Sequence, residues 1–181
     1  CSHFLEHLLF KGTAQRTALD IAQAIDAVGG EMNAYTTKEY TTFYTRTVAE
    51  DAALSLDILC DIVSDPALRE ADVESERQVI LEEIAMRADE PADLVHDLVH
   101  EQRFGDHGLG RDTAGTAETV SATTAEHIRA FMDATYGPSA IVVAAAGAVD
   151  HDATVEQVAQ SLRRPASVNA KRLAPRDAGD N

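Results

Sequence analysis

The sequence has few cysteines, no tryptophan and no long apolar run. Its 181 residues contain two cysteines, Cys1 and Cys60, which excludes a small domain held together by several disulfides. Cys60 falls within an apolar helical pattern, so we expect it to be a buried small hydrophobic residue. No apolar run approaches the roughly 20 residues that a membrane-spanning helix needs, so the sequence predicts no membrane span.

Basic residues are also scarce. The chain has 15 lysines and arginines against 31 acidic residues, which gives a formal net charge of −16. This balance argues against binding to nucleic acid or to an anionic membrane surface, because both require a basic patch. It favours a solvated acidic surface or an attraction for cationic substrates.

The apolar pattern predicts mostly helices with a few strands. Helical spacing indicates helices over residues 2–10, 17–28, 51–63, 70–87, 92–102, 123–135 and 150–162. Residues 31–36 and 39–48 are rich in Thr, Tyr and Phe and predict an antiparallel hairpin. The apolar residues 140–146 predict a third, buried strand. The expected fold class is therefore α+β, with a mixed or antiparallel sheet packed on one side by helices.

The residues with the clearest chemistry lie at the start of the chain. His3, Glu6 and His7 form an H-x-x-E-H pattern. On a helix, His3 and His7 project from one face, where two imidazoles can hold one metal ion. Glu6 lies on the same side and could accept a proton from water there. A catalytic zinc site needs a third protein ligand, so another part of the chain must supply it.

The predicted helix over residues 70–87 offers carboxylates for that position. Glu76 and Glu83 are seven residues apart and share a helix face. If Glu83 points into the site, Glu76 can stand behind it and hydrogen-bond a ligand histidine. The alternative is a solvated acidic face, which is the commoner state of acidic helix residues. The spacing alone leaves both readings open.

A second histidine pair competes with the first. His96 and His100 are also four residues apart, and Asp97 occupies the place of the glutamate in an H-E-x-x-H motif. Asp is shorter than Glu, and no third ligand is evident, so we interpret this segment as a partly exposed helix. His107, His127 and His151 are expected to be surface residues.

The opening motif and the Phe10-Lys11-Gly12-Thr13 segment after it resemble the pitrilysin, or insulinase, family of zinc metallopeptidases. This family includes the β subunit of mitochondrial processing peptidase and bacterial processing-protease-like members. Four further segments resemble family landmarks in the same order, namely Gly29-Gly30-Glu31-Met32-Asn33-Ala34-Tyr35-Thr36, Glu76-Arg77 with Glu83-Ile84, Tyr136-Gly137-Pro138, and Gly147 with Val149-Asp150. The resemblance extends from residue 2 to about residue 164.

The resemblance implies a role for each matching residue. His3, His7 and Glu83 would be the ligands of one Zn²⁺ ion, and Glu6 would be the general base. Glu76 would be the supporting carboxylate. The segment around Asn33 and Ala34 would be the edge strand that takes an extended peptide by strand addition. The implied function is a zinc-dependent endopeptidase acting on extended or presequence-like peptides. The alternative is a non-catalytic peptide-binding or structural subunit of the same fold.

The resemblance also implies parts that the sequence does not contain. Family members have strands before the motif and a second, homologous half that closes over the site. We therefore expect residues 1–164 to be a partial N-terminal zinc-peptidase domain and residues 165–181 to be a linker or frayed tail. The chain alone is expected to be inactive. The bacterial type suggests a cytoplasmic protein, although a targeting segment before residue 1 is not excluded.

Overall fold

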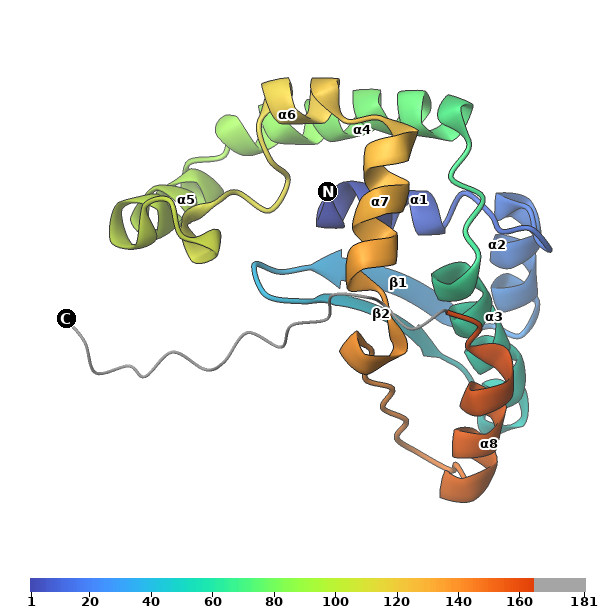
Figure 1. The fold of residues 1–181 in the computed structure, drawn as a ribbon. Coiled ribbons are helices and arrows are strands. Elements are labelled where there is room, and N and C mark those ends of the chain that lie inside the picture. The colour runs from blue at the N-terminus through green and yellow to red at the C-terminus, as the bar shows by residue number, and fades with distance from the viewer. Residues whose placement is uncertain (165–181) are drawn as a thin grey trace.

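The computed structural model describes residues 1–164 (Figure 1). Two strands are followed and preceded by helices, so the predicted α+β class is confirmed. The elements in chain order are α1 (Ser2–Leu9), α2 (Ala18–Ala27), β1 (Glu31–Thr36), β2 (Thr41–Arg46), α3 (Ala52–Ser64), α4 (Glu70–Ala88), α5 (Pro91–Phe104), α6 (Ala117–Ala122), α7 (Ala125–Thr135) and α8 (His151–Ser161), with short 3₁₀ turns at Ala49–Asp51, Gly108–Gly110 and Pro138–Ala140.

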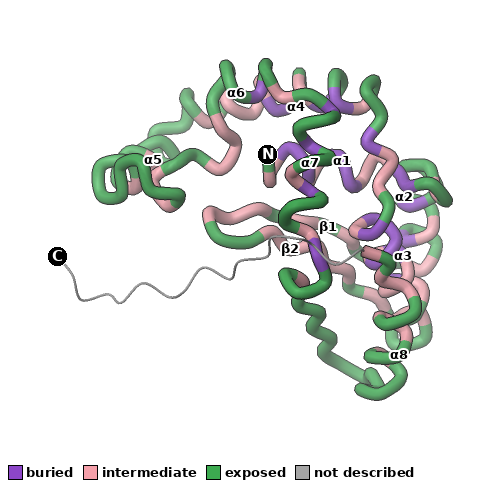
Figure 2. The backbone as a smooth tube through the Cα atoms, in the orientation of Figure 1, coloured by how far each residue is buried: buried purple, intermediate pink, exposed green. Residues whose placement is uncertain are grey.

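Helix α1 lies at the centre of the core. Its residues Phe4, Leu5, Leu8 and Leu9 are buried and pack with apolar residues of α2, α3, α4 and α7. Figure 2 shows buried residues gathered on α1 and the helices around it. The apolar spacing leaves His3, Glu6 and His7 on the less buried side of α1. The core therefore fixes the helix that carries the motif.

The predicted hairpin is present, with β1 and β2 paired in antiparallel register from Glu31↔Arg46 to Thr36↔Thr41. The turn at Thr37–Tyr40 is closed by a hydrogen bond from the Thr37 amide to the Tyr40 carbonyl. Among residues 1–164 the sheet has two strands only, and β1 packs on α1. The end of the hairpin thus lies beside the motif.

The strand predicted at residues 140–146 is wrong. A short 3₁₀ turn occupies Pro138–Ala140, and residues 141–146 have no regular structure and are mostly exposed. A strand requires a partner for its backbone groups, and no described strand hydrogen-bonds this segment. The apolar pattern indicated a segment suited to a buried strand, but it did not indicate which other strand would pair with it.

Helix α4 lies along α1 and agrees closely with the predicted helix over residues 70–87. Val73 and Ile80 are buried against the core. Arg77 lies on the same helix face as Val73 and Ile80, and its guanidinium donates to the Val120, Ser121 and Thr123 carbonyls at the α6–α7 junction. These contacts fix the rotation of α4, and with it the direction in which its carboxylates point.

Two details of the helices differ from the sequence-based expectation. Helix α6 was not predicted, because its six residues are too short for a clear apolar period. Helix α7 was predicted to begin at residue 123 but begins at Ala125. Thr124 is its N-cap and accepts a hydrogen bond from the His127 amide.

No helix within residues 1–164 is long and apolar enough to cross a bilayer. The predicted linker or tail at residues 165–181 lies outside the described residues.

Candidate metal centre

The two motif histidines converge at the open side of α1. His3 and His7 are one helical turn apart, and their Nε2 atoms are 3.3 Å from each other. The rings meet edge to face, with centroids 4.7 Å apart. Both imidazoles therefore direct the same nitrogen toward one point.

Helix α4 brings Glu83 to that point from 76 residues further along the chain. Its Oε2 atom lies 3.7 Å from His3 Nε2 and 3.6 Å from His7 Nε2. Within residues 1–164 these three side chains are the only group of three His, Cys, Asp or Glu ligands whose atoms lie close enough to share a metal ion. The structure thus brings together the three residues singled out in the sequence.

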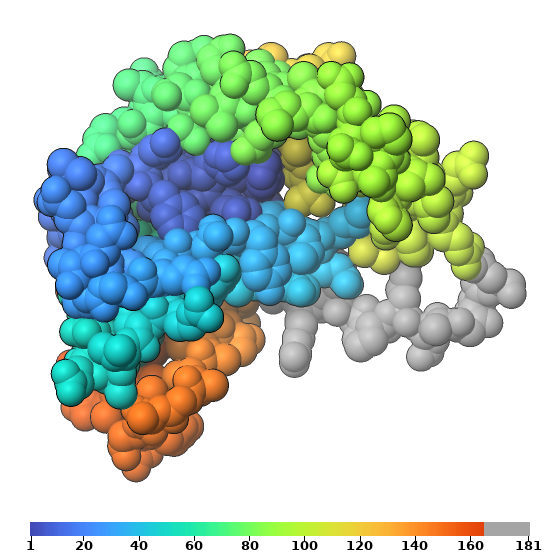
Figure 3. All heavy atoms as spheres, turned by 180° about the vertical axis from the view of Figure 1, so that it is seen from behind, coloured from blue at the N-terminus to red at the C-terminus, as the bar shows by residue number. Residues whose placement is uncertain are grey.

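The arrangement fits a zinc ion. Two imidazole nitrogens and one carboxylate oxygen are a donor set that catalytic zinc uses, leaving a fourth position for water. Bond lengths of about 2.1 Å in a tetrahedral site place ligand atoms roughly 3.4 Å apart, close to the separations of 3.3, 3.6 and 3.7 Å found here. Figure 3 shows α1 in a recess between α4 and β1, so the site is open on one side.

Glu76 orients the second histidine. Its Oε2 atom accepts a hydrogen bond of 3.0 Å from His7 Nδ1, which leaves His7 Nε2 free to face the site. The carboxylate is buried, with its side chain 6% exposed, and its other oxygen lies 2.6 Å from Lys11 Nζ. A contact of this kind fixes the tautomer and ring plane of a ligand histidine. Sequence reasoning anticipated the Glu76 contact but missed Lys11, which is part of the segment after the motif.

Glu6 is held by the hairpin. Thr36, at the end of β1, donates a hydrogen bond from Oγ1 to Glu6 Oε2. The Thr36 and Thr41 hydroxyl oxygens are 3.1 Å apart. Sequence reasoning did not identify either threonine. The only available signal was that Thr36 closes the segment resembling the family landmark.

The surroundings of His3 favour its neutral form. Burial lowers the pKa of His3, and the neighbouring His7 lowers it further, whereas the carboxylates of Glu6 and Glu83 act in the opposite direction. Its Nδ1 atom is buried without a hydrogen-bond partner among the described residues. A neutral imidazole is the form that binds a metal ion.

Asn33 and Ala34 lie in the middle of β1, whose second edge is unpaired within residues 1–164. The Ala34 amide donates 2.8 Å to the side-chain oxygen of Asn33. The Ala34 amide is therefore satisfied locally, and its hydrogen bond to Asn33 can be replaced by one to a main-chain acceptor. An edge of this kind can add another strand.

The competing histidine pair has different partners. His100 Nδ1 lies 2.7 Å from the His96 carbonyl, and Asp97 forms an ion pair with Arg87 at 2.7 Å. No third ligand completes a metal site at this pair among the described residues. His107 accepts a hydrogen bond from the Leu109 amide. His96 and His107 are exposed, and His100 is half-buried.

Comparison with known proteins places the chain in a family. Residues 1–117 match the family described as insulinase (peptidase family M16). A protein of Streptomyces coelicolor named as an uncharacterized zinc protease is 52% identical over 178 residues, which are 97% of this chain and 39% of that protein. The chain thus spans about two fifths of this relative.

Solved structures share the fold. A protease from Helicobacter pylori superposes with a TM-score of 0.86 at 24% identity, covering 96% of this chain and 42% of that one. A domain from Pseudomonas fluorescens described as an inactive peptidase M16 domain superposes with a TM-score of 0.81 at 18% identity, covering 91% of this chain and 41% of that one. From the sequence match over most of its length, the chain belongs to the insulinase family of peptidases, peptidase family M16.

Proposed function

We propose that the protein is a zinc-dependent endopeptidase in which His3, His7 and Glu83 hold one Zn²⁺ ion. The observation that supports this most directly is the convergence of His3 Nε2, His7 Nε2 and Glu83 Oε2 within 4.8 Å of one another. Membership of the insulinase family and the zinc-protease name of the Streptomyces relative agree with it.

Each remaining residue of the site has a proposed role. When bound, zinc would polarise the scissile carbonyl and lower the pKa of a bound water. Glu6 accepts the proton of the attacking water and delivers it to the leaving amine. Glu76 keeps His7 Nε2 directed at the site through its hydrogen bond to Nδ1. The chain thus supplies a base and an oriented ligand set.

The proposed substrate is an extended peptide that pairs with the free edge of β1. Main-chain hydrogen bonds at Asn33 and Ala34 would fix the register of the peptide and leave its side-chain preference loose. Residues 1–164 would form part of an N-terminal catalytic domain. Because the chain spans 39% of the Streptomyces relative, we propose that a second, homologous half closes over the peptide, on this chain or on another.

The alternative is a non-catalytic peptide-binding or structural subunit. The Pseudomonas neighbour is described as inactive, so the fold itself does not decide between the two functions. The side chains favour catalysis, because His3, Glu6, His7 and Glu83 are all present. A subunit without catalytic activity would not need to keep all four of these side chains.

Replacement of the base tests the proposal. In the protein assayed together with the second half, Glu6→Gln should retain one zinc per chain, because the ligands are unchanged. Peptide hydrolysis should fall by about 100-fold or more, the contribution usual for a general base. Zinc is measured by elemental analysis and hydrolysis with a fluorogenic peptide.

Two further variants define the metal site. His3→Ala should lose zinc, whereas His96→Ala is the matched control and should keep it. If wild-type protein that is prepared without chelators contains no zinc, the ligand assignment is wrong. Hydrolysis by Glu6→Gln at the wild-type rate would overturn the role of Glu6, and zinc-loaded wild-type protein that cleaves no peptide would favour the non-catalytic alternative.

A further inference from the structure

The carboxylate of Glu6 is held by a side chain from outside its own helix. Thr36 Oγ1 donates a hydrogen bond to Glu6 Oε2, and both residues are partly buried. Thr36 is the last residue of β1 and pairs with Thr41, the first residue of β2. The contact therefore connects the turn end of the hairpin to the motif helix.

A second hydroxyl supports the first. Thr36 and Thr41 stand opposite each other in the register, and their hydroxyl oxygens are 3.1 Å apart. One of the two must donate to the other, and Thr36 uses its hydrogen for Glu6. Thr41 then donates to Thr36 and fixes the rotation of its hydroxyl. The result is a chain of hydrogen bonds from Thr41 through Thr36 to Glu6.

Tyr136 stands beside this chain. Its hydroxyl is buried and makes no well-formed hydrogen bond with the described residues. Burial raises the pKa of Tyr136, contact with Thr41 lowers it, and the charge of Glu6 raises it. The phenol is therefore near both Thr41 and Glu6 and stays protonated at neutral pH, so it adds no charge beside them.

A base on a helix surface needs such a restraint. A glutamate side chain has several free torsions and loses rotational freedom when it is held in one position. A general base must also lie within hydrogen-bond reach of the proton that it takes. One carboxylate oxygen of Glu6 is occupied by Thr36, which leaves the other oxygen as the one available to water.

We propose that Thr36 is a positioning residue for Glu6, with Thr41 holding the Thr36 hydroxyl in the donating orientation. The inference rests on the proposed function, because it assigns the support of the proposed base. It also joins two parts of the site, since β1 carries both the proposed peptide edge at Asn33 and Ala34 and the hydroxyl that orients Glu6.

The first test compares Thr36→Val with Thr36→Ser in the zinc-loaded protein, assayed together with the second half. Valine keeps the shape and strand preference of threonine and removes the hydroxyl that donates to Glu6 and accepts from Thr41, whereas serine keeps that hydroxyl. Thr36→Val should lower kcat roughly 10-fold, as expected for loss of one hydrogen bond to a charged group. KM and zinc content should not change. Thr36→Ser should keep most of the activity, and Thr41→Val should show a smaller loss in kcat.

The second test does not depend on turnover. A phosphinic peptide imitates the tetrahedral geometry reached during hydrolysis, and its affinity is measured by titration calorimetry. Thr36→Val should weaken its binding about 10-fold when Glu6 is present. In a Glu6→Gln background the same substitution should have little effect, because the contribution of Thr36 acts through Glu6.

The outcomes separate this inference from the proposed function. Wild-type protein that binds neither zinc nor the phosphinic peptide contradicts the proposed function, and the inference fails with it. If the wild type binds both but Thr36→Val behaves like the wild type, only the role of Thr36 is refuted. Equal weakening by Thr36→Val with and without Glu6 would likewise refute it and indicate a general effect on the hairpin.

Discussion

Lys11 contributes to the site indirectly, so its chemistry alone does not reveal its importance. Its Nζ atom lies 2.6 Å from Glu76 Oε1, and the other oxygen of Glu76 accepts the hydrogen bond from His7 Nδ1. Lys11 therefore fixes the rotation of the carboxylate that orients a proposed zinc ligand. We predict that Lys11→Met raises the zinc dissociation constant about 10-fold, at the lower end of what loss of a supporting contact costs. Chelator competition measures this constant.

Two variants control that prediction. Lys11→Arg keeps a cation within reach of Glu76 and should bind zinc nearly as well as the wild type. Lys38→Met removes a lysine that contacts the Arg111 carbonyl instead, and it should leave zinc binding unchanged. A zinc dissociation constant for Lys11→Met equal to that of the wild type would show that Glu76 needs no second contact to orient His7.

At the residue scale, sequence reasoning found the groups that would carry chemistry and missed those that support them. His3, Glu6 and His7 are close in sequence, and helical spacing alone places them on one face. Glu83 and Glu76 came from a shared helix face and the family resemblance. Thr36 and Lys11 contact their partners across 30 and 65 residues of sequence. No local pattern encodes such contacts, because they depend on how β1, α1 and α4 pack.

Among the elements, the segment between α1 and α2 is anchored to α3 by a buried aspartate. Asp61 accepts hydrogen bonds from Thr13 at 2.8 Å and from Arg16 at 2.6 Å, and its side chain is 6% exposed. Arg16 also pairs with Asp57, whose side chain is 44% exposed. The two aspartates share one cation, but Asp61 is more buried and also accepts hydrogen bonds from Thr13 and Gln15.

This difference gives a prediction about stability. Asp61→Asn should lower the free energy of unfolding by roughly 2–3 kcal/mol, because it removes one partner of a largely buried ion pair. Asp57→Asn is the matched control and should cost less than about 1 kcal/mol, because exposed pairs contribute little. Urea unfolding followed by circular dichroism measures both. Equal losses would mean that burial of Asp61 does not strengthen its interaction with Arg16.

The helices and the hairpin were largely predictable, and the third strand was not. Helix α4 was predicted over residues 70–87 and runs from Glu70 to Ala88, because apolar spacing is a local signal. The hairpin pairs neighbouring segments, so its partner was also local. Residues 140–146 have the composition of a buried strand, but strand formation depends on a distant partner. The sequence pattern indicates what a segment can bury and does not indicate which segment covers it.

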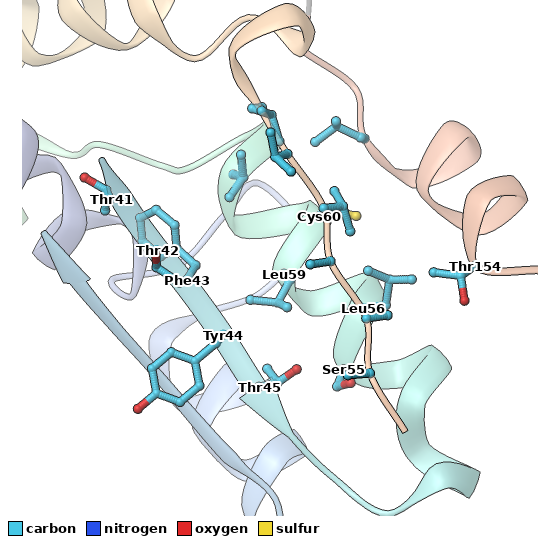
Figure 4. A pocket seen from close by; sticks show the side chains of 18 of the residues that line it. Thr41, Thr42, Phe43, Tyr44, Thr45, Ser55, Leu56, Leu59, Cys60 and Thr154 are labelled. Carbon is cyan, nitrogen blue, oxygen red and sulfur yellow. The ribbon is translucent and has the colours of Figure 1, made fainter. Parts of the chain in front are cut away.

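For the molecule as a whole, residues 141–146 leave apolar surface uncovered. Residues 141–146 run beside β2 and α3 along a groove of about 810 Å³, and Figure 4 shows Phe43, Leu56 and Leu59 facing this space. Val142 is 92% exposed and Val143 is 45% exposed. No backbone hydrogen bond joins residues 142–146 to another part of the described chain. Exposed apolar side chains beside unpaired backbone groups are a template for association.

We therefore predict that the 181-residue chain self-associates through this segment, although its net charge of −16 opposes association. Val142→Lys should raise the dissociation constant of that association about 10-fold or more, because a lysine on an exposed edge blocks pairing. Val99→Lys is the control: Val99 is 59% exposed, but it lies in α5, where backbone groups bond within the helix. Sedimentation velocity measures both variants. If they reduce association equally, net charge rather than the edge at residues 141–146 governs it, since each substitution adds one positive charge.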